Sequence, residues 1–162
     1  MMFEFDIEDY MSDLEGLTIQ EKLEDLSVQY DELVSALHEI TDAQDRLIDE
    51  YETSVCDELS ASVSSLINQN HWENQVTVNG NTFTVNAKPT NVGIWCGWNQ
   101  DQWVIIIDTE AIASNAKRYE TLSNLAVRLN LPYQQGKEDI RVHVEENELQ
   151  PTIIRIITTL CE

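Results

Sequence analysis

Two carboxylates beside an isoleucine-rich segment are the first candidates for chemistry in this sequence. Asp108 and Glu110 follow the run Val-Ile-Ile-Ile, and carboxylates at the end of a strand can hold a divalent cation. A nuclease-like core also needs a basic residue after an acid on the adjacent strand, and the segment VIIIDTEA supplies none. The sequence therefore favours the other interpretation, a solvated strand end at which Thr109 or Ser114 caps the next helix.

The remaining candidate residues form no catalytic or metal-binding pattern. The sequence contains no phosphate loop, dinucleotide fingerprint or nucleophile elbow. His71 and His143 are 72 positions apart, and each fits a surface or edge position. Cys56, Cys96 and Cys161 lack a C-x-x-C pair and a histidine at ligand spacing, so they predict neither a disulfide framework nor a zinc site. We expect a protein without a catalytic site, metal or cofactor.

Acidic residues are concentrated in the first part of the chain. The formal net charge is −21, and residues 1–60 hold 19 acids and 2 bases, whereas residues 61–162 hold 11 acids and 7 bases. A high-salt proteome would acidify both parts, so the asymmetry argues against that explanation. Direct nucleic-acid binding is disfavoured because no basic stripe offsets phosphate repulsion. The complement of this charge is a basic protein partner.

A long helix is predicted over residues 18–70. There is no Gly or Pro from Leu17 to Asn79, and Thr18-Ile-Gln-Glu21 is a capping-box pattern. Apolar residues recur at heptad positions a and d over four heptads, with Gln44 as a polar interruption and Tyr51 as the last a position. Beyond Tyr51 the spacing changes, which indicates a stutter or a new helix. The apolar a and d residues form a predicted oligomer seam: Leu23, Leu26, Tyr30, Leu33, Leu37, Ile40 and Leu47.

The acids of this helix fall at the outer positions b, c and f. They are a solvated face or a surface for a basic partner, and the candidate partner-binding residues among them are Glu24, Asp25, Asp31, Glu32, Glu39 and Asp42. Positions e and g are mostly uncharged, with Lys22 and Glu50 only at the ends. This pattern favours multi-helix packing, or docking on the protein's own sheet, at least as much as an isolated two-helix dimer. Because the seam would be exposed on a monomer, we predict a homo-oligomer, most simply a dimer.

Two hairpins are predicted after the helix. Asn79-Gly80 marks the first, and a two-residue loop there pairs Val76 with Phe83 and Thr77 with Thr82, which leaves one apolar and one Thr-rich face. In the second, a turn centred on Gln100-Asp101 pairs Trp98 with Trp103, Cys96 with Ile105 and Ile94 with Ile107, and its other face holds Trp95, Gly97, Val104 and Ile106.

Both faces of the second hairpin are apolar. This fits a central sheet position that is covered on both sides, or one side that faces a partner. Trp95 and Trp98 are therefore candidate partner-binding residues, and the alternatives are ordinary core packing and a ligand pocket.

The end of the chain adds two helices and a strand. Helical spacing predicts a helix over residues 111–131, which stops before Pro132. Ile140, Val142 and Val144 alternate with polar residues as a one-faced strand. The last segment reads as a helix with Pro151 in its first turn.

We therefore predict an α+β fold in which a long acidic helix precedes a small, mainly antiparallel sheet packed by two helices. The expected parts are an acidic and apolar arm (1–16), a helical oligomerisation or packing region (17–70) and a small α+β domain (71–162). The first residues are acidic where a signal peptide is basic, and no apolar run reaches the ~18–20 residues of a membrane span, so we expect a cytoplasmic protein, which includes a virus or phage product.

The leading functional hypothesis is a non-catalytic assembly or adaptor protein that self-associates through helices and binds another protein. The alternatives are an acidic inhibitor that mimics nucleic acid in a basic site, and a small enzyme with an unrecognised site.

Overall fold

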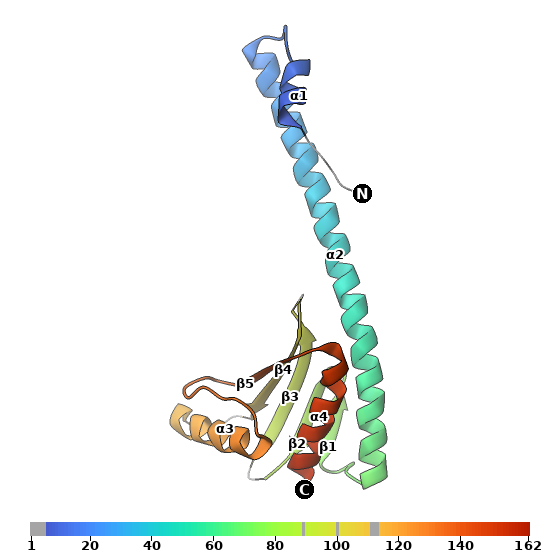
Figure 1. Ribbon diagram of the computed structural model, residues 1–162, viewed down its shortest axis with the longest axis vertical. Coiled ribbons are helices and arrows are strands. Elements are labelled where there is room, and N and C mark those ends of the chain that lie inside the picture. The colour runs from blue at the N-terminus through green and yellow to red at the C-terminus, as the bar shows by residue number, and fades with distance from the viewer. Residues whose placement is uncertain (1–5, 89, 100, 111–113) are drawn as a thin grey trace. The chain divides into compact units, whose positions relative to one another are not determined.

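The computed structural model describes residues 6–88, 90–99, 101–110 and 114–162. Their elements follow the α+β order that the sequence predicts (Figure 1). The helices are α1 (Ile7–Asp13), α2 (Ile19–Asn70), α3 (Asn115–Leu129) and α4 (Glu146–Cys161), and the strands are β1 (Val76–Asn79), β2 (Thr82–Asn86), β3 (Asn91–Trp98), β4 (Trp103–Thr109) and β5 (Ile140–Val144). The chain divides into two compact units, Met1–Leu47 and Ile48–Glu162.

The first unit contains α1 and the first part of α2, which lie side by side (Figure 1). Asp6 caps α1 by accepting the backbone N–H groups of Glu8 and Asp9. At the start of α2 the predicted capping box is present: the Thr18 N–H donates to the Glu21 carboxylate at 2.8 Å, and the Glu21 N–H donates to Thr18 Oγ1 at 3.2 Å. Hydrogen bonding of the Glu21 carboxylate to Thr18, chiefly to its backbone N–H, lowers the pKa of Glu21. The predicted arm therefore contains a helix, and residues 1–5 of the arm lie outside the described residues.

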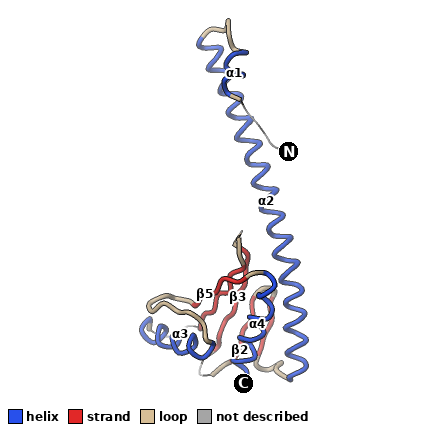
Figure 2. The backbone as a smooth tube through the Cα atoms, viewed as in Figure 1, coloured by secondary structure: helices blue, strands red, loops and turns tan. Residues whose placement is uncertain are grey.

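The second unit is built on a five-stranded antiparallel sheet in the order β1-β2-β3-β4-β5. Figure 2 shows its strands in red. On one face, the core face, α4 contacts β2 and β4, and Cys56 of α2 places its Sγ 3.9 Å from Cys96 Sγ of β3. The α2 side chains that are buried in this unit recur at steps of three and four residues: Cys56, Leu59, Val63 and Ile67. One sheet face is thus packed by helices.

The predicted register of the first hairpin is wrong by two residues. Val76 pairs with Val85 and Val78 pairs with Phe83, so the loop is Gly80-Asn81. Gly80 has a φ of +59°, and the φ of Asn81 is not positive, which is the pattern of a turn that needs glycine only at its first central position. Asn81 is also held by β3, since its carbonyl accepts the Cys96 N–H at 3.1 Å. A two-residue slip keeps every side chain on its predicted face.

The predicted residue pairs of the second hairpin and the predicted strand at Ile140–Val144 are both confirmed. Trp98 pairs with Trp103, Cys96 with Ile105 and Ile94 with Ile107. The centre of the predicted turn includes Gln100, which lies outside the described residues. β5 then pairs with β4, which places Ile140 opposite Ile107.

The two last helices differ from the prediction at their starts. α3 is described from Asn115, with Ser114 as its N-cap, and residues 111–113 of the predicted helix lie outside the described residues. α4 begins at Glu146, so Pro151 lies inside the helix rather than in its first turn. A proline inside a helix costs about 3 kcal/mol, and the burial of the side chains on both sides of it offsets that cost. These side chains are Leu149, Ile153, Ile156, Ile157 and Leu160.

None of the helices in the described part of the chain combines the length and the apolar character that a membrane crossing requires.

Candidate partner-binding surfaces

The oligomer seam is largely exposed. Leu23, Tyr30, Leu37, Ile40 and Leu47 are each between 62% and 68% exposed. Leu26 and Leu33 are half-buried. Of the twelve exposed large apolar side chains in the described residues, ten lie in the first unit, which locates the main uncovered apolar surface there. An exposed apolar stripe of this kind is uncommon on the surface of a monomer.

The seam ends where α2 begins to pack on the sheet of the second unit. The Tyr51 hydroxyl accepts the Trp103 indole N–H at 3.2 Å and donates to the Glu146 carboxylate at 2.7 Å. The Tyr51 ring meets that of Trp98 edge-on, with 5.2 Å between centroids. Burial is the main cause of the raised pKa of Tyr51. The change in apolar spacing after Tyr51 is thus a change of packing partner within one continuous helix.

α1 covers one flank of the seam in the first unit. The Tyr10 hydroxyl donates a hydrogen bond to the Asp25 carboxylate, and Leu14, next to the end of α1, is only 5% exposed. Partial burial, followed by the nearby Asp25 carboxylate, raises the pKa of Tyr10 to about 12. Asp25 is therefore half-buried and engaged within its own unit.

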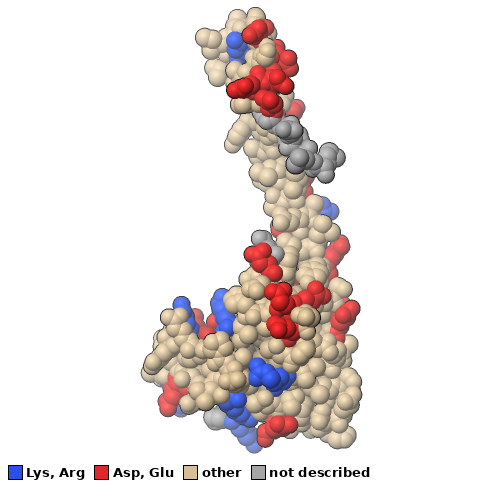
Figure 3. Space-filling model, in the orientation of Figure 1, with Lys and Arg blue, Asp and Glu red and all other residues tan. Residues whose placement is uncertain are grey.

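The other candidate acids of α2 remain on its outer face. Glu24, Asp31, Glu32, Glu39 and Asp42 are all exposed. The ion pairs of the described residues, Arg118–Asp108 and Arg141–Asp139, both lie in the second unit. Figure 3 shows Asp and Glu side chains gathered over α1 and the first turns of α2.

The two cations of the first unit do not neutralise these carboxylates. Lys22 forms no ion pair within the described residues, and Arg46 Nε donates instead to the backbone carbonyl of Asp42 at 3.2 Å. Residues 6–47 hold 13 acids and 2 bases, so they carry a formal charge of −11. Within the described residues, no ion pair offsets this charge.

The candidate tryptophans lie on opposite faces of the sheet. Trp98 belongs to the core face and is half-buried, and its backbone N–H donates to the Glu52 carboxylate at 3.3 Å. Trp95 is 39% exposed on the other face, with its indole ring lying over Gly97, where a Cβ atom would overlap the ring. The two residues therefore do not form one surface.

The face around Trp95 is only partly apolar. Val104 is 8% exposed and Ile106 is half-buried, whereas the polar side chains that pair with them on β5, His143 and Arg141, are exposed. This face remains a candidate binding surface centred on a single tryptophan.

The carboxylates considered for a cation have separate protein partners. Both oxygens of Asp108 lie 2.7 Å from Arg118 Nη2, and this bond raises the pKa of Arg118. Glu110 accepts a hydrogen bond from the Asn91 side chain at 2.8 Å. Among the described residues there is no group of three or more His, Cys, Asp or Glu side chains that could hold a metal ion. The basic partner of Asp108 comes from α3 rather than from a neighbouring strand, so strand patterns missed it.

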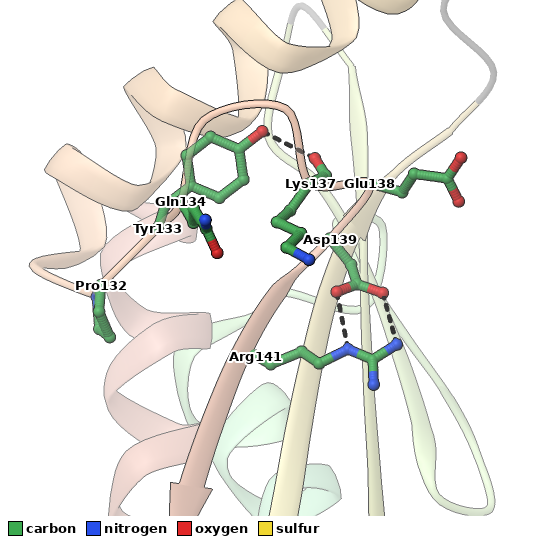
Figure 4. Close-up of a pocket in the computed structure, with 7 residues that line it drawn as sticks. All are labelled: Pro132, Tyr133, Gln134, Lys137, Glu138, Asp139 and Arg141. Atoms are coloured by element: carbon green, nitrogen blue, oxygen red, sulfur yellow. Dashed lines mark hydrogen bonds and ion pairs between the residues drawn. The ribbon is translucent and has the colours of Figure 1, made fainter.

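Sequence reasoning also missed a pocket of about 750 Å³ at the loop that connects α3 to β5 (Figure 4). Arg141 Nε lies 2.9 Å from the Asp139 carboxylate, and the Tyr133 hydroxyl donates to the Lys137 carbonyl at 2.8 Å. These contacts engage the Arg141 guanidinium, the Asp139 carboxylate and the Tyr133 hydroxyl. Its lining comes mostly from a loop without periodic spacing: Pro132, Tyr133, Gln134, Lys137, Glu138, Asp139 and Arg141.

Comparisons of the chain with protein-family models, with curated proteins and with solved structures find no match.

Proposed function

We propose that this protein is a non-catalytic assembly or adaptor protein that self-associates through the seam of α2 and binds another protein. The observation that carries the proposal is the exposure of five large apolar side chains at a and d positions between Leu23 and Leu47. A second copy supplies the same stripe, and knobs-into-holes packing is the usual way in which a and d residues are buried.

The apolar surface is large enough to drive association. Fully burying a Leu, Ile or aromatic side chain contributes about 1.5–3 kcal/mol, and about two thirds of that remains for side chains that are 62% to 68% exposed. Ten such side chains in two copies give roughly 10–20 kcal/mol, against an association cost of about 4–15 kcal/mol. A dimer at micromolar concentration needs a net gain of about 8 kcal/mol, which lies within the range of this balance.

The outer face of α2 supports a second candidate function, recognition of a basic partner. Its exposed acids lie away from the seam and have no compensating ion pairs within the described part of the first unit. A self-associated protein would therefore still present them to Lys and Arg side chains of a partner. In the inhibitor version of this function, the partner is a nucleic-acid-binding protein and the acids stand in for phosphates.

Light scattering with a matched pair of variants tests self-association. The wild-type dimer has an expected mass of about 37 kDa, twice the 18.6 kDa of one chain. Leu37→Asp places a charge in the centre of the seam and should give the monomer mass, whereas Ser35→Asp, on the exposed outer face, should keep the dimer. A wild-type mass of 18.6 kDa at micromolar concentration would overturn the proposal.

A further inference from the structure

Cys56 and Cys96 lie together in the core of the second unit. Cys56 belongs to α2, Cys96 belongs to β3, and the two are 40 residues apart in a unit that spans Ile48–Glu162. Their Sγ atoms are 3.9 Å apart, and the side chains are 5% and 0% exposed. Spacing in the sequence did not predict this pair, because the helix and the strand meet only in the folded unit.

The two sulfurs are close enough for a disulfide to be within reach. A disulfide holds its sulfurs at about 2.05 Å, so closure requires an approach of roughly 1.9 Å. Rotation of the two side chains about their Cα–Cβ bonds moves the sulfurs on this scale. Cys161 of α4 is half-buried, and of the three described cysteines only Cys56 and Cys96 are in sulfur contact. The geometry therefore singles out one pair of thiols.

We propose that Cys56 and Cys96 form a redox-modification site, which hydrogen peroxide converts to an intramolecular disulfide. In the first step the Cys56 thiolate attacks one peroxide oxygen, the O–O bond breaks, hydroxide leaves, and Cys56 becomes a sulfenic acid. The hydroxide takes up the proton that Cys56 released. In the second step the Cys96 sulfur attacks Cys56 Sγ, the S–O bond breaks, and the hydroxyl group leaves as water with the Cys96 proton. The two thiols lose two electrons, and one peroxide becomes two water molecules.

The surroundings of the two thiols assign the first step to Cys56. Cys56 keeps a small exposed surface, whereas Cys96 has none. Hydrogen bonding from the Cys96 thiol lowers the pKa of Cys56 and outweighs the opposing effects of burial and nearby carboxylates. The same contact, followed by burial, raises the pKa of Cys96. Because the thiolate is the reactive form of cysteine, Cys56 is the attacking thiol and Cys96 the resolving thiol.

Nearby carboxylates and tight packing favour a small, neutral oxidant. The charges of Glu52 and Asp57 oppose ionisation of Cys56, and Glu52 is held there by the backbone N–H of Trp98 at 3.3 Å. An anionic disulfide such as oxidised glutathione would be repelled by these charges, and attack on it would attach a bulky group to a buried sulfur. Hydrogen peroxide is uncharged and little larger than water. The site therefore fits a peroxide better than a bulky disulfide.

The disulfide would tie α2 to the middle of the sheet. Cys56 is the first of the α2 side chains that are buried in the second unit, and Tyr51, five residues before it, bonds to Trp103. A crosslink from the helix to β3 restricts the unfolded chain and opposes local detachment of this part of α2. Oxidation should therefore raise the Tm of the second unit, measured by tryptophan fluorescence, by roughly 5–15 °C. An unchanged Tm in the oxidised protein would overturn this constraint on α2.

Counting the thiols of the full chain tests the proposal. The reduced, folded protein is treated with hydrogen peroxide, and it is then unfolded and alkylated with N-ethylmaleimide for intact-mass measurement. The untreated chain has three cysteines and should take up three maleimide groups. The oxidised chain should take up a single group, on Cys161, and peptide mapping should find the peptides of Cys56 and Cys96 joined. Dithiothreitol should restore the full uptake.

Cys161 is the internal reference for this test. It is more exposed than the pair, and burial raises the pKa of its thiol. Loss of the Cys56 and Cys96 thiols before that of Cys161 supports the proposal. Oxidation of Cys161 while the pair remains reduced, or a disulfide that includes Cys161, would overturn it. Disulfide formation by oxidised glutathione as fast as by peroxide at the same concentration would overturn the assignment of a peroxide.

A matched pair of serine variants tests the order of the two steps. Cys96→Ser removes the resolving sulfur and keeps a hydrogen-bond donor, so the sulfenic acid of Cys56 should accumulate and be trapped by dimedone. Cys161→Ser makes the same change outside the pair and should form the disulfide as readily as the wild type does. Dimedone labelling of Cys161 instead of Cys56 in Cys96→Ser would overturn the assignment of Cys56 as the attacking thiol. If Cys96→Ser does not fold, the thiol count of the wild type still decides the proposal.

Discussion

Removal of one hydroxyl group tests how Tyr51 of α2 is held on the sheet of the second unit. In Tyr51→Phe the ring remains, and with it the contacts to the Trp98 and Trp103 rings at centroid distances of 5.2 Å and 5.8 Å. The variant loses the acceptor for the indole N–H of Trp103, which is 1% exposed. Glu146 is exposed and can bond to water instead. The expected cost is therefore that of one unsatisfied buried donor.

An unsatisfied buried donor costs about 1–3 kcal/mol. For a chain of this size, about 2 kcal/mol lowers the Tm by roughly 4–8 °C. All four tryptophans lie in the second unit, so the melt is followed by tryptophan fluorescence, which reports on that unit. Tyr30→Phe is the matched control, because Tyr30 is 68% exposed on the seam. Equal melting temperatures for the two variants would refute the role of the Tyr51 hydroxyl.

Three further predictions concern the first unit and the partner. Leu33→Asp should dissociate the oligomer in light scattering, whereas Asp31→Asn should change the free energy of unfolding by no more than ~0.5 kcal/mol. Equal effects of the two variants would show that the heptad register is wrong. Because the pKa of Tyr10 is raised, the neutral Tyr10 side chain contributes its full stabilisation of the first unit below pH ~10, the ordinary tyrosine value. This stabilisation is lost as the pH rises towards about 12. Circular dichroism should show that Tyr10→Phe loses less helix over this pH range than the wild type does. The same pH profile for the variant and the wild type would contradict this role of Tyr10. Binding of a basic partner to the wild type should be salt-sensitive, and amide substitution of the six candidate acids should weaken it. Loss of binding in Trp95→Ala alone would assign the interaction to the sheet. The six are Glu24, Asp25, Asp31, Glu32, Glu39 and Asp42.

Local signals in the sequence determined most of the elements. The capping box and the absence of Gly and Pro predict α2, because each bond of a helix joins residues four apart. The β3–β4 register also follows from the sequence, since only one pairing places Trp98 opposite Trp103 and Ile94 opposite Ile107. The heptads assign the seam and the acids to different faces of α2, a consequence of helical geometry alone.

Only the tertiary structure decided which surfaces remain free. Tyr51 continues the heptad pattern, yet it packs on Trp98 and Trp103 because the sheet of its own unit is within reach. The first-hairpin register depends on a bond from β3 to Asn81, and the position of Pro151 inside α4 depends on burial of the flanking side chains. These features arise from contacts between residues distant in sequence, whose energies outweigh the local preferences of a turn or a proline.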